Sequence, residues 1–388
     1  MRVLMVVGAR PNFVKAAPLL EAMRRRPDME TVLVHTGQHY DYEMSRVFFD
    51  QLGMRSPDVN LEVGSGSPVR QVAEIMLRLE SVMDQTQPDL MLVVGDVNST
   101  LAGALTAVKT GRPIAHVEAG LRSFDRAMPE EVNRVLTDAI SDFLFVTEPA
   151  GVENLLNEGR PKDRIFHVGN VMIDALQHFL PHARRYVLAA PHPLANQPLN
   201  GRFGLVTLHR PSTVDDLPTL SSIWGALAEI ATEVPLIFPI HPRTQARMTA
   251  AGLTPPRHGA GNGLRLVPPL SYLHFLKLLS EAAVVITDSG GVQEETTALG
   301  VPCLTVRENT ERPITLTEGT NVLVGLGPQR LLVEARKVLR GEARQGRVPE
   351  LWDGHAAERI VDILTQQVRV PEREPVQKPQ FRSVGEIV

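Results

Sequence analysis

Residues 88–123, PDLMLVVGDVNSTLAGALTAVKTGRPIAHVEAGLRS, contain the pattern that decides the fold. The apolar run LMLVV ends at Gly95 and Asp96, a helical segment follows as far as Gly111, and the next apolar run, IAHVEA, contains Glu118. Continuous apolar strands that alternate with helices are typical of a parallel sheet covered on both faces. Side chains at the carboxyl ends of such strands open into a ligand crevice, so we expect Asp96 and Glu118 to lie close together.

The same alternation extends in both directions from this stretch. Further apolar runs separated by helical patterns are RVLMVV, TVLVH, FLFVTE, FGLVTLH, PLIFPIH, RLVPPL, AVVITD and VPCLTV. We therefore expect an α/β protein with two Rossmann-like, doubly wound parallel-sheet domains in tandem and an active-site cleft between them. The predicted domains are residues 1–170, with the acidic cluster, and residues 171–368. The proline-rich, charged tail 369–388 is expected to be extended or mobile.

Composition narrows the classes of protein to be considered. A chain of 388 residues with 43% hydrophobic and 22% charged residues is typical of a globular protein of two domains. The net charge of -4 argues against nucleic acid as a partner. No apolar run approaches the roughly 20 residues needed to span a bilayer, so we expect no membrane association. The single cysteine, Cys303, excludes a disulfide within one chain and fits a cytoplasmic location.

Two strand-to-helix turns are candidates for binding phosphate. After the first strand, Gly8 allows a close approach, while Arg10 and Lys15 add positive charge at a helix N-terminus. The alternative for Arg10 is a surface ion pair. Neither GxGxxG after a strand nor GxxxxGK[ST] occurs, which argues against a dinucleotide or P-loop site.

The second candidate turn is the segment ITDSGGVQEE, residues 286–295. Ser289, Gly290 and Gly291 precede a helix, so backbone N–H groups and the helix dipole favour an oxyanion there. Glu295, one turn into the helix, is suited to accept hydrogen bonds from two ribose hydroxyls. The alternative is a capped helix whose acidic residues only stabilise its first turn.

The acids have structural alternatives as well. Asp96 is placed to cap the helix that begins near Ser99, whereas Glu118 lies in a buried strand, where a charge is costly unless it is paired or functional. Glu130 and Glu131 lie at a predicted helix start, where acids are electrostatically favourable. We expect Arg122 and Arg134 to pair with these acids or with a ligand phosphate.

Histidines end two of the predicted strands. His209 and His241 are placed to contact a phosphate or to transfer protons, although a single histidine is more often a structural group. The pairs with helical spacing are His35 with His39 and His178 with His182. The first pair begins in a strand and Pro181 interrupts the second, so we expect no metal site.

Taken together, the motifs resemble those of the non-hydrolysing UDP-N-acetylglucosamine 2-epimerases. The matching segments run in order over residues 1–325: GARPNFVKAAP, TGQHYD, VVGDVNSTLA, HVEAGLRS, PEEVNR, GNVMID, TLHRP, DSGGVQEET, GVP and RENTERP. The resemblance implies a glycosyltransferase-B type fold and a cytoplasmic homodimer that binds a UDP-amino sugar in the interdomain cleft. It implies no cofactor.

The resemblance also implies a mechanism, in which the proton at sugar carbon 2 is removed and UDP is expelled from carbon 1. The resulting 2-acetamidoglucal takes up a proton on its opposite face and UDP adds again, giving UDP-N-acetylmannosamine. By motif position, the implied catalytic residues are Asp96, Glu118, Glu130 and His209. The implied substrate-binding residues are Arg10, Lys15, Ser289, Gly290, Gly291, Glu295 and Arg312.

Some features of the chain depart from the family pattern or fit a different activity. After His209 and Arg210 this chain continues PST, where many family members continue with a second arginine and a glutamate. Gln38 and His39 lack the second glutamine of the allosteric bacterial subgroup, although Arg70 matches an arginine of that site. The TGQHYDYEMS wording also occurs in epimerases of different UDP-amino sugars. A hydrolysing epimerase, a UDP-sugar-dependent glycosyltransferase and a non-catalytic nucleotide-sugar-binding protein are also compatible with these residues.

Overall fold

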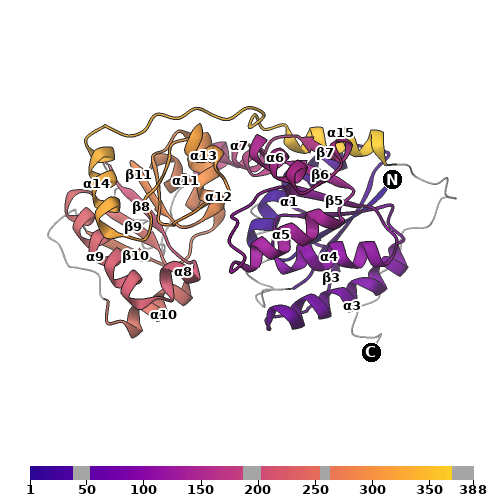
Figure 1. Cartoon of the computed structure of the whole chain (residues 1–388), viewed down its shortest axis with the longest axis horizontal. Coiled ribbons are helices and arrows are strands. Elements are labelled where there is room, and N and C mark those ends of the chain that lie inside the picture. Colours follow the sequence, from indigo (N-terminus) through magenta and orange to yellow (C-terminus); the bar gives the residue numbers. More distant parts are fainter. Residues whose placement is uncertain (38–52, 187–201, 254–262, 369–388) are drawn as a thin grey trace. The chain divides into compact units, whose positions relative to one another are not determined.

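The computed structural model of the chain describes residues 1–37, 53–186, 202–253 and 263–368. These residues form two compact units, each built on one parallel sheet (Figure 1). Unit 1 comprises Met1–Ala175 and the described residues from Leu351 onward, and unit 2 comprises Leu176–Glu350. The expected α/β fold class with two parallel-sheet domains is confirmed.

The sheet of unit 1 has seven strands in the order β3-β2-β1-β4-β5-β6-β7. They are β1 (Arg2–Val7), β2 (Glu30–His35), β3 (Val59–Asn60), β4 (Leu90–Val94), β5 (Ile114–Ala119), β6 (Phe143–Val146) and β7 (Ile165–His167). Every residue of β4 and β5 is buried, which explains their continuous apolar sequences. The strand order reverses between β1 and β4, which are paired side by side. A ligand site is therefore expected at their carboxyl ends.

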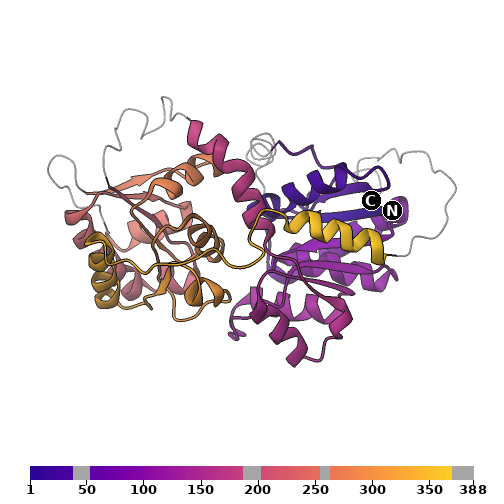
Figure 2. The same cartoon turned by 90° about the horizontal axis from the view of Figure 1, so that it is seen from above.

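Helices cover both faces of this sheet. They are α1 (Arg10–Arg24), α3 (Pro68–Thr86), α4 (Asn98–Lys109), α5 (Pro129–Ile140), α6 (Pro149–Asn157), the 3-10 turn Lys162–Arg164, the start of α7 (Val171–Arg185), and α15 (Ala356–Gln367). Helix α4 packs between α3 and α5, and buried side chains of α3 and α4 form a core with β1, β2 and β4. Figure 2 shows α15 on the face of the sheet that carries α1.

Unit 2 repeats this architecture with six strands in the order β10-β9-β8-β11-β12-β13. The strands are β8 (Gly204–Thr207), β9 (Leu236–Pro239), β10 (Leu264–Val267), β11 (Val284–Thr287), β12 (Cys303–Thr305) and β13 (Asn321–Leu323). The helices are α8 (Pro211–Val214), α9 (Leu217–Glu233), α10 (Pro242–Ala250), α11 (Tyr272–Glu281), α12 (Gly290–Leu299), α13 (Ile314–Thr317) and α14 (Pro328–Leu339). Its strand order reverses between β8 and β11. Buried apolar side chains of α9 and α14 pack on the sheet.

The unit boundaries differ from the predicted domains in one respect. The first boundary lies at Ala175, near the predicted position 170, but the chain returns to unit 1 at Leu351. Helix α15, which the sequence assigned to the second domain, packs against α1. Arg26, two residues after the end of α1, pairs with Asp362 of α15, and their Nη1 and Oδ1 atoms are 3.0 Å apart. No local pattern encodes an ion pair between residues that are 336 positions apart. The predicted tail 369–388 lies outside the described residues, and none of the described helices has the length and apolar character to cross a membrane.

Candidate active site

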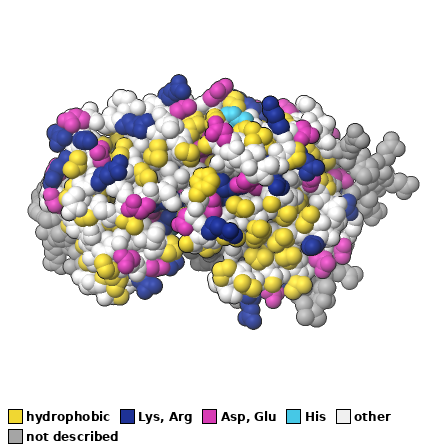
Figure 3. All heavy atoms as spheres, viewed as in Figure 1, with side chains coloured by type: hydrophobic (Ala, Val, Ile, Leu, Met, Phe, Trp, Pro, Cys, Tyr) yellow, Lys and Arg dark blue, Asp and Glu magenta, His cyan; other side chains and the backbone are white. Residues whose placement is uncertain are grey.

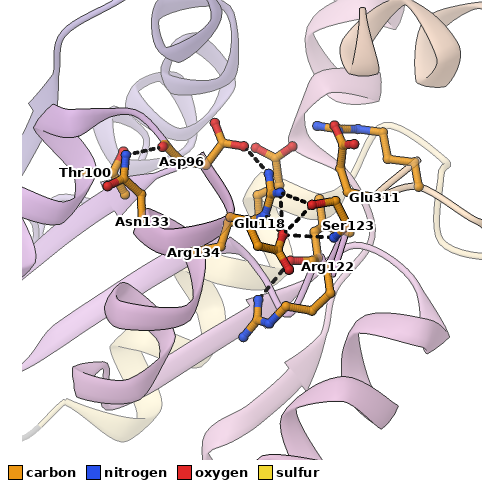
Figure 4. Close-up of polar contacts among 12 residues, drawn as sticks. Asp96, Thr100, Glu118, Arg122, Ser123, Asn133, Arg134 and Glu311 are labelled. Carbon is orange, nitrogen blue, oxygen red and sulfur yellow. Dashed lines mark hydrogen bonds and ion pairs between the residues drawn. The ribbon is translucent and has the colours of Figure 1, made fainter. Parts of the chain in front are cut away.

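Asp96 lies directly after β4 and forms an ion pair with a buried arginine of α5. Arg134 Nη1 is 2.5 Å from Asp96 Oδ2 (Figure 4). The helix that follows is preceded by Val97 as its N-cap, and its N-terminus has no side-chain cap. Asp96 therefore does not act as the helix cap that the sequence offered as an alternative. Its side chain is 26% exposed, so the carboxylate is both held by a cation and accessible.

Glu118 lies in an irregular part of β5. The pairing with β6 shifts between Val117 and Ala119, and Glu118 has a φ of 78°. A bulge of this kind re-aims a side chain, and a non-glycine residue with positive φ is strained. The Glu118 carboxylate forms an ion pair with Lys15 of α1, and both side chains are buried. Lys15 was grouped with the phosphate-binding residues on sequence grounds, and the structure shows that it compensates the charge of Glu118.

The two acids at the start of α5 have different roles. Glu131 is buried and accepts hydrogen bonds from the backbone N–H groups of Ser123 and Phe124, at 2.8 and 2.9 Å. It also pairs with Arg134 Nη2 at 2.6 Å. Burial alone would raise the pKa of Glu131, but these hydrogen bonds and the arginine outweigh burial and lower it. Glu130 is half-buried and has no hydrogen-bond or ion-pair partner among the described residues, so its carboxylate is available for a ligand.

Arg134 therefore pairs both with Asp96, which is partly exposed, and with Glu131, which accepts hydrogen bonds from the backbone of the loop at Ser123 and Phe124. Figure 4 shows its guanidinium between Asp96 and the Ser123 loop. Arg122, which the sequence grouped with the same acids, pairs instead with Asp138 and Glu158, at 2.7 Å in each case. This pairing was not expected, because Glu158 lies 36 residues away.

In unit 2, the strands at the reversal point carry His209 and Asp288. Asp288 is fully buried and accepts hydrogen bonds from the backbone N–H groups of His209 and Arg210, both at 2.9 Å. His209 Nδ1 lies 3.2 Å from Asp288 Oδ1, and half of the His209 side chain is exposed. Burial favours a higher pKa for Asp288, but the hydrogen bonds and charge of His209 outweigh it and lower the pKa. The carboxylate thus orients an exposed imidazole.

The start of α12 lies next to β11 and carries a buried arginine. Ser289 is the N-cap residue, and its side chain makes no capping bond to the helix. Arg312 Nε lies 2.9 Å from Glu294 Oε1, and its Nη1 pairs with Glu311. A Cβ atom at Gly290 would lie 2.3 Å from Arg312 Nη1, so only glycine leaves room for the guanidinium. Gly291 is the second residue of the helix.

Three arginines surround Glu311, which is buried. Arg307 Nη2 is 2.8 Å from Glu311 Oε2, and Arg210 Nη2 is 3.5 Å from Glu311 Oε1, while Arg312 is adjacent in sequence. Although burial opposes it, the charges of these arginines lower the pKa of Glu311 well below its usual value. Because three cations face two carboxylates, those of Glu311 and Glu294, this cluster has an excess positive charge suited to an anion.

Glu295 is buried in α12 and accepts a hydrogen bond from Tyr272. The Tyr272 hydroxyl is 3.0 Å from Glu295 Oε1. Burial raises the pKa of Glu295 to about 7, with a further contribution from the neighbouring Glu294 and an opposing one from Tyr272. Tyr272 was not identified from the sequence, since its partner is 23 residues away and an isolated tyrosine in a helix is no signal.

The structure brings the site residues together in two sets. In unit 1, Asp96, Glu118 and Lys15 lie at or beside the ends of β4 and β5, and Glu130 starts α5. In unit 2, the start of α12, His209, Glu295 and Arg312 lie around the ends of β8 and β11. The remaining candidate, Arg10, is the first residue of α1, but its side chain lies outside the described part of the chain. The parts of the resemblance that involve Gln38 and His39 also lie outside the described residues.

The paired parallel sheets and the sites at their strand ends define a two-domain α/β protein of the glycosyltransferase-B type. The site of unit 1 contains carboxylates that are paired with cations. The site of unit 2 contains the N-terminus of α12 and neighbouring arginines. The family model described as UDP-N-acetylglucosamine 2-epimerase matches residues 21–365. The chain belongs to this family.

Individual relatives agree with this assignment. The chain is 40% identical to a UDP-N-acetylglucosamine 2-epimerase of Methanococcus maripaludis, over 92% of this chain and 97% of the relative. It is also 40% identical to a UDP-2,3-diacetamido-2,3-dideoxy-D-glucuronate 2-epimerase of Pseudomonas aeruginosa, over 94% and 99% of the two chains. The crystal structure of the Methanocaldococcus jannaschii UDP-GlcNAc 2-epimerase with UDP-GlcNAc and UDP has a TM-score of 0.84 at 38% identity. That match covers 94% of this chain and 100% of the other.

Proposed function

We propose that this protein interconverts UDP-N-acetylglucosamine and UDP-N-acetylmannosamine without hydrolysing either. The observation that carries the proposal is the set of acids beside the ends of β4 and β5, of which Asp96 and Glu118 are each paired with a buried cation. Relatives of similar identity are named as epimerases at carbon 2 of UDP-sugars, which supports this reaction class.

The acids of unit 1 carry out the proton transfers in this proposal. A carboxylate takes the proton from carbon 2, the electron pair of the C–H bond forms the C1–C2 double bond, and the C1–O bond breaks as UDP leaves with its electrons. The 2-acetamidoglucal then receives a proton at carbon 2 from the opposite face while UDP adds at carbon 1. Acid–base groups are therefore needed on both faces of the ring, and Asp96, Glu118 and Glu130 supply them.

The cations beside two of these acids have a chemical purpose. A buried carboxylate without a counter-charge takes up a proton and ceases to be a base. Lys15 beside Glu118 and Arg134 beside Asp96 compensate the negative charge of the two acids. Glu130 has no such partner among the described residues, which suits a group that exchanges its proton during the reaction.

Unit 2 holds the leaving group in this proposal. The N–H groups at Ser289, Gly290 and Gly291, together with Arg312 and Arg10, bind the diphosphate, and the positive charge stabilises UDP as it departs. His209, oriented by Asp288, contacts the diphosphate and is suited to proton transfer. Glu295 accepts hydrogen bonds from the ribose hydroxyls. The proposed elimination and re-addition require no redox cofactor, because no carbon is oxidised in either step.

Incubation of the purified protein with UDP-N-acetylglucosamine in heavy water tests the proposal. We expect UDP-N-acetylmannosamine carrying solvent deuterium at carbon 2, and deuterium in the recovered substrate. Free N-acetylmannosamine with UDP would indicate a hydrolysing epimerase, and UDP release only with an added acceptor would indicate a glycosyltransferase. The amide variants Asp96→Asn, Glu118→Gln and Glu130→Gln should lose deuterium incorporation while UDP still binds. Absence of deuterium and of manno product with wild type would overturn the proposal.

A second substrate is supported by the Pseudomonas aeruginosa relative, which is named for a diacetamido glucuronate and has the same identity to this chain. This sugar undergoes the same chemistry at carbon 2 but adds an acetamido group at carbon 3 and a carboxylate at carbon 6. Parallel assays with the two UDP-sugars decide between them. The physiological substrate is expected to have the higher kcat/KM, because specificity is a ratio of these values.

We also propose that the protein forms a homodimer through the α3–α5 face of unit 1. Large hydrophobic side chains are exposed on these neighbouring helices: Val69, Leu77, Val108, Val135 and Leu136. Figure 3 shows hydrophobic side chains gathered over α3 and α4. Contiguous exposed apolar surface of this kind is typical of protein interfaces. Light scattering should give twice the chain mass, and Leu77→Glu should give a monomer, whereas Leu156→Glu on α6 should not; a monomeric wild type would overturn this proposal.

A further inference from the structure

A buried network of charges lies beneath the proposed acids of unit 1. His116 Nδ1, on β5, is 2.6 Å from Asp138 Oδ1 on α5, and both side chains are inaccessible to solvent. Asp138 Oδ2 is 2.7 Å from Arg122 Nη2, whose guanidinium also pairs with Glu158. The network is not part of the acid–base chemistry described above, since none of its members is one of the proposed acids.

Each ring nitrogen of His116 has a different partner. Its other ring nitrogen, Nε2, lies 2.8 Å from the backbone carbonyl of Gly95, which can only accept a hydrogen bond. Its Nδ1 faces the Asp138 carboxylate. Burial by itself would raise the pKa of Asp138, but the charges and hydrogen bonds of His116 and Arg122 outweigh it and lower the pKa. The ring of His116 therefore links the Gly95 carbonyl to the Asp138 carboxylate.

The network ends on the two turns that carry the proposed acids. Gly95, whose carbonyl accepts from His116, directly precedes Asp96 and has a φ of 71°. Gly120, whose N–H donates to Asp138 Oδ2 at 3.0 Å, follows Glu118 by two residues and has a φ of 81°. One buried histidine–aspartate pair thus holds the backbone at the end of β4 and at the end of β5.

Glu118 makes this support necessary. Its positive φ is strained and persists only where the surroundings fix the backbone. The His116 ring fixes both turns relative to each other, because it is rigid and its two nitrogens point in divergent directions, toward Gly95 and toward Asp138.

We propose that His116 and Asp138 are positioning residues that set the spacing of Asp96 and Glu118. This inference rests on the proposed function for its catalytic consequence, but not for the hydrogen bonds that hold the two turns. Misplacement of a reacting group by about 1 Å lowers the rate about 100-fold. Loss of the network should therefore lower kcat about 100-fold and leave KM within about threefold, because the nucleotide is bound by other residues.

Kinetics of His116→Gln and Asp138→Asn test the catalytic part. The control is Thr137→Val, on the same helix and fully buried, whose hydroxyl has no hydrogen-bond partner among the described residues. We expect wild-type kcat in the control and the selective loss of kcat in the two network variants. Equal losses in all three variants, or a rise in KM that accounts for the loss of kcat/KM, would show a merely structural role and overturn the proposal.

Nitrogen-15 NMR of histidine-labelled wild-type protein tests the hydrogen bonds of the ring without any substrate. The ring resonances that disappear in His116→Gln are those of His116, and both ring nitrogens should have the chemical shifts of hydrogen-bonded atoms. If the variant does not fold, the resonances of the buried ring are identified by through-space contacts with neighbouring residues. A His116 ring with one nitrogen that makes no hydrogen bond overturns the proposal, even if the enzyme turns over its substrate. Conversely, inactivity of wild type on both UDP-sugars would refute the proposed function and leave this measurement valid.

Discussion

Replacement of Gly290 by alanine tests whether Arg312 of unit 2 binds the diphosphate. The new Cβ atom would lie 2.3 Å from Arg312 Nη1 and 2.7 Å from Glu311 Oε1, and both of these side chains are buried. An ordinary contact begins at 3.4 Å. The guanidinium must therefore recede by about 1.1 Å, which is the difference between 3.4 and 2.3 Å.

The size of the effect follows from what Arg312 loses. A hydrogen bond to a charged group contributes about 1.5–3 kcal/mol, so displacement from a bound diphosphate should weaken UDP binding about 10- to 150-fold. Alanine in place of glycine in a helix gains about 0.5–1 kcal/mol, which partly offsets the strain within the protein. We expect a net loss of about 1–2 kcal/mol in the free energy of unfolding.

Calorimetric titration with UDP and urea unfolding measure the two effects separately. The matched control is Gly225→Ala in α9, where a Cβ atom would have nothing within 4 Å. The control should bind UDP as wild type does and gain about 0.5–1 kcal/mol in stability. If Gly290→Ala binds UDP within about threefold of wild type while its stability falls, Arg312 serves only to neutralise Glu294 and Glu311. That result would refute the assignment of Arg312 to the diphosphate.

Three further predictions concern charge and pH. Burial raises the pKa of Glu295 to about 7, so its ionised fraction, and with it UDP affinity, should fall about tenfold from pH 8 to pH 6 in wild type. Calorimetry should show that this pH dependence of the affinity is missing in Glu295→Gln. Burial likewise raises the pKa of Asp174 from 3.8 to about 6, so its contribution to stability is complete below about pH 3.8 and is lost as the pH rises through 6. Between pH 5 and pH 8 the free energy of unfolding should fall by about 1.4 kcal/mol more in wild type than in Asp174→Asn, and parallel urea curves for the two proteins would contradict this. Lys15→Met leaves the buried Glu118 without its cation and should lower the free energy of unfolding by about 3–5 kcal/mol, measured with urea. The double variant Lys15→Met/Glu118→Gln should regain most of this stability. If the double variant is as unstable as Lys15→Met, loss of the ion pair is not the cause.

Much of the fold is encoded in local patterns. The apolar runs at β1, β4, β5 and β11 predicted buried parallel strands, because an unbroken apolar run of the length of a strand indicates a strand that is buried on both faces. The acids Asp96 and Glu118 were found for a related reason, since a charge at the end of a buried strand is costly without a function or a partner. The start of α5 was predicted by its acids, although not which of Glu130 and Glu131 stays available to a ligand.

The partners of the site residues could not be predicted in the same way. Lys15 and Glu118 are 103 residues apart, and His116 and Asp138 are 22 apart on different elements. Asp96 likewise pairs with Arg134, 38 residues further along the chain, and does not cap the helix that follows it. Local sequence carries no information about such pairs, because they depend on which strands become neighbours.

The sequence by itself determined the alternation of strands and helices, the two-domain class, the family, and the residue types at the strand ends. Only the tertiary structure decided which charges compensate one another and where the chain returns to unit 1. The physical reason lies in the strand order. Its reversal between β1 and β4 places α1 and its Lys15 beside the end of β5, so that the buried Glu118 carboxylate meets its cation.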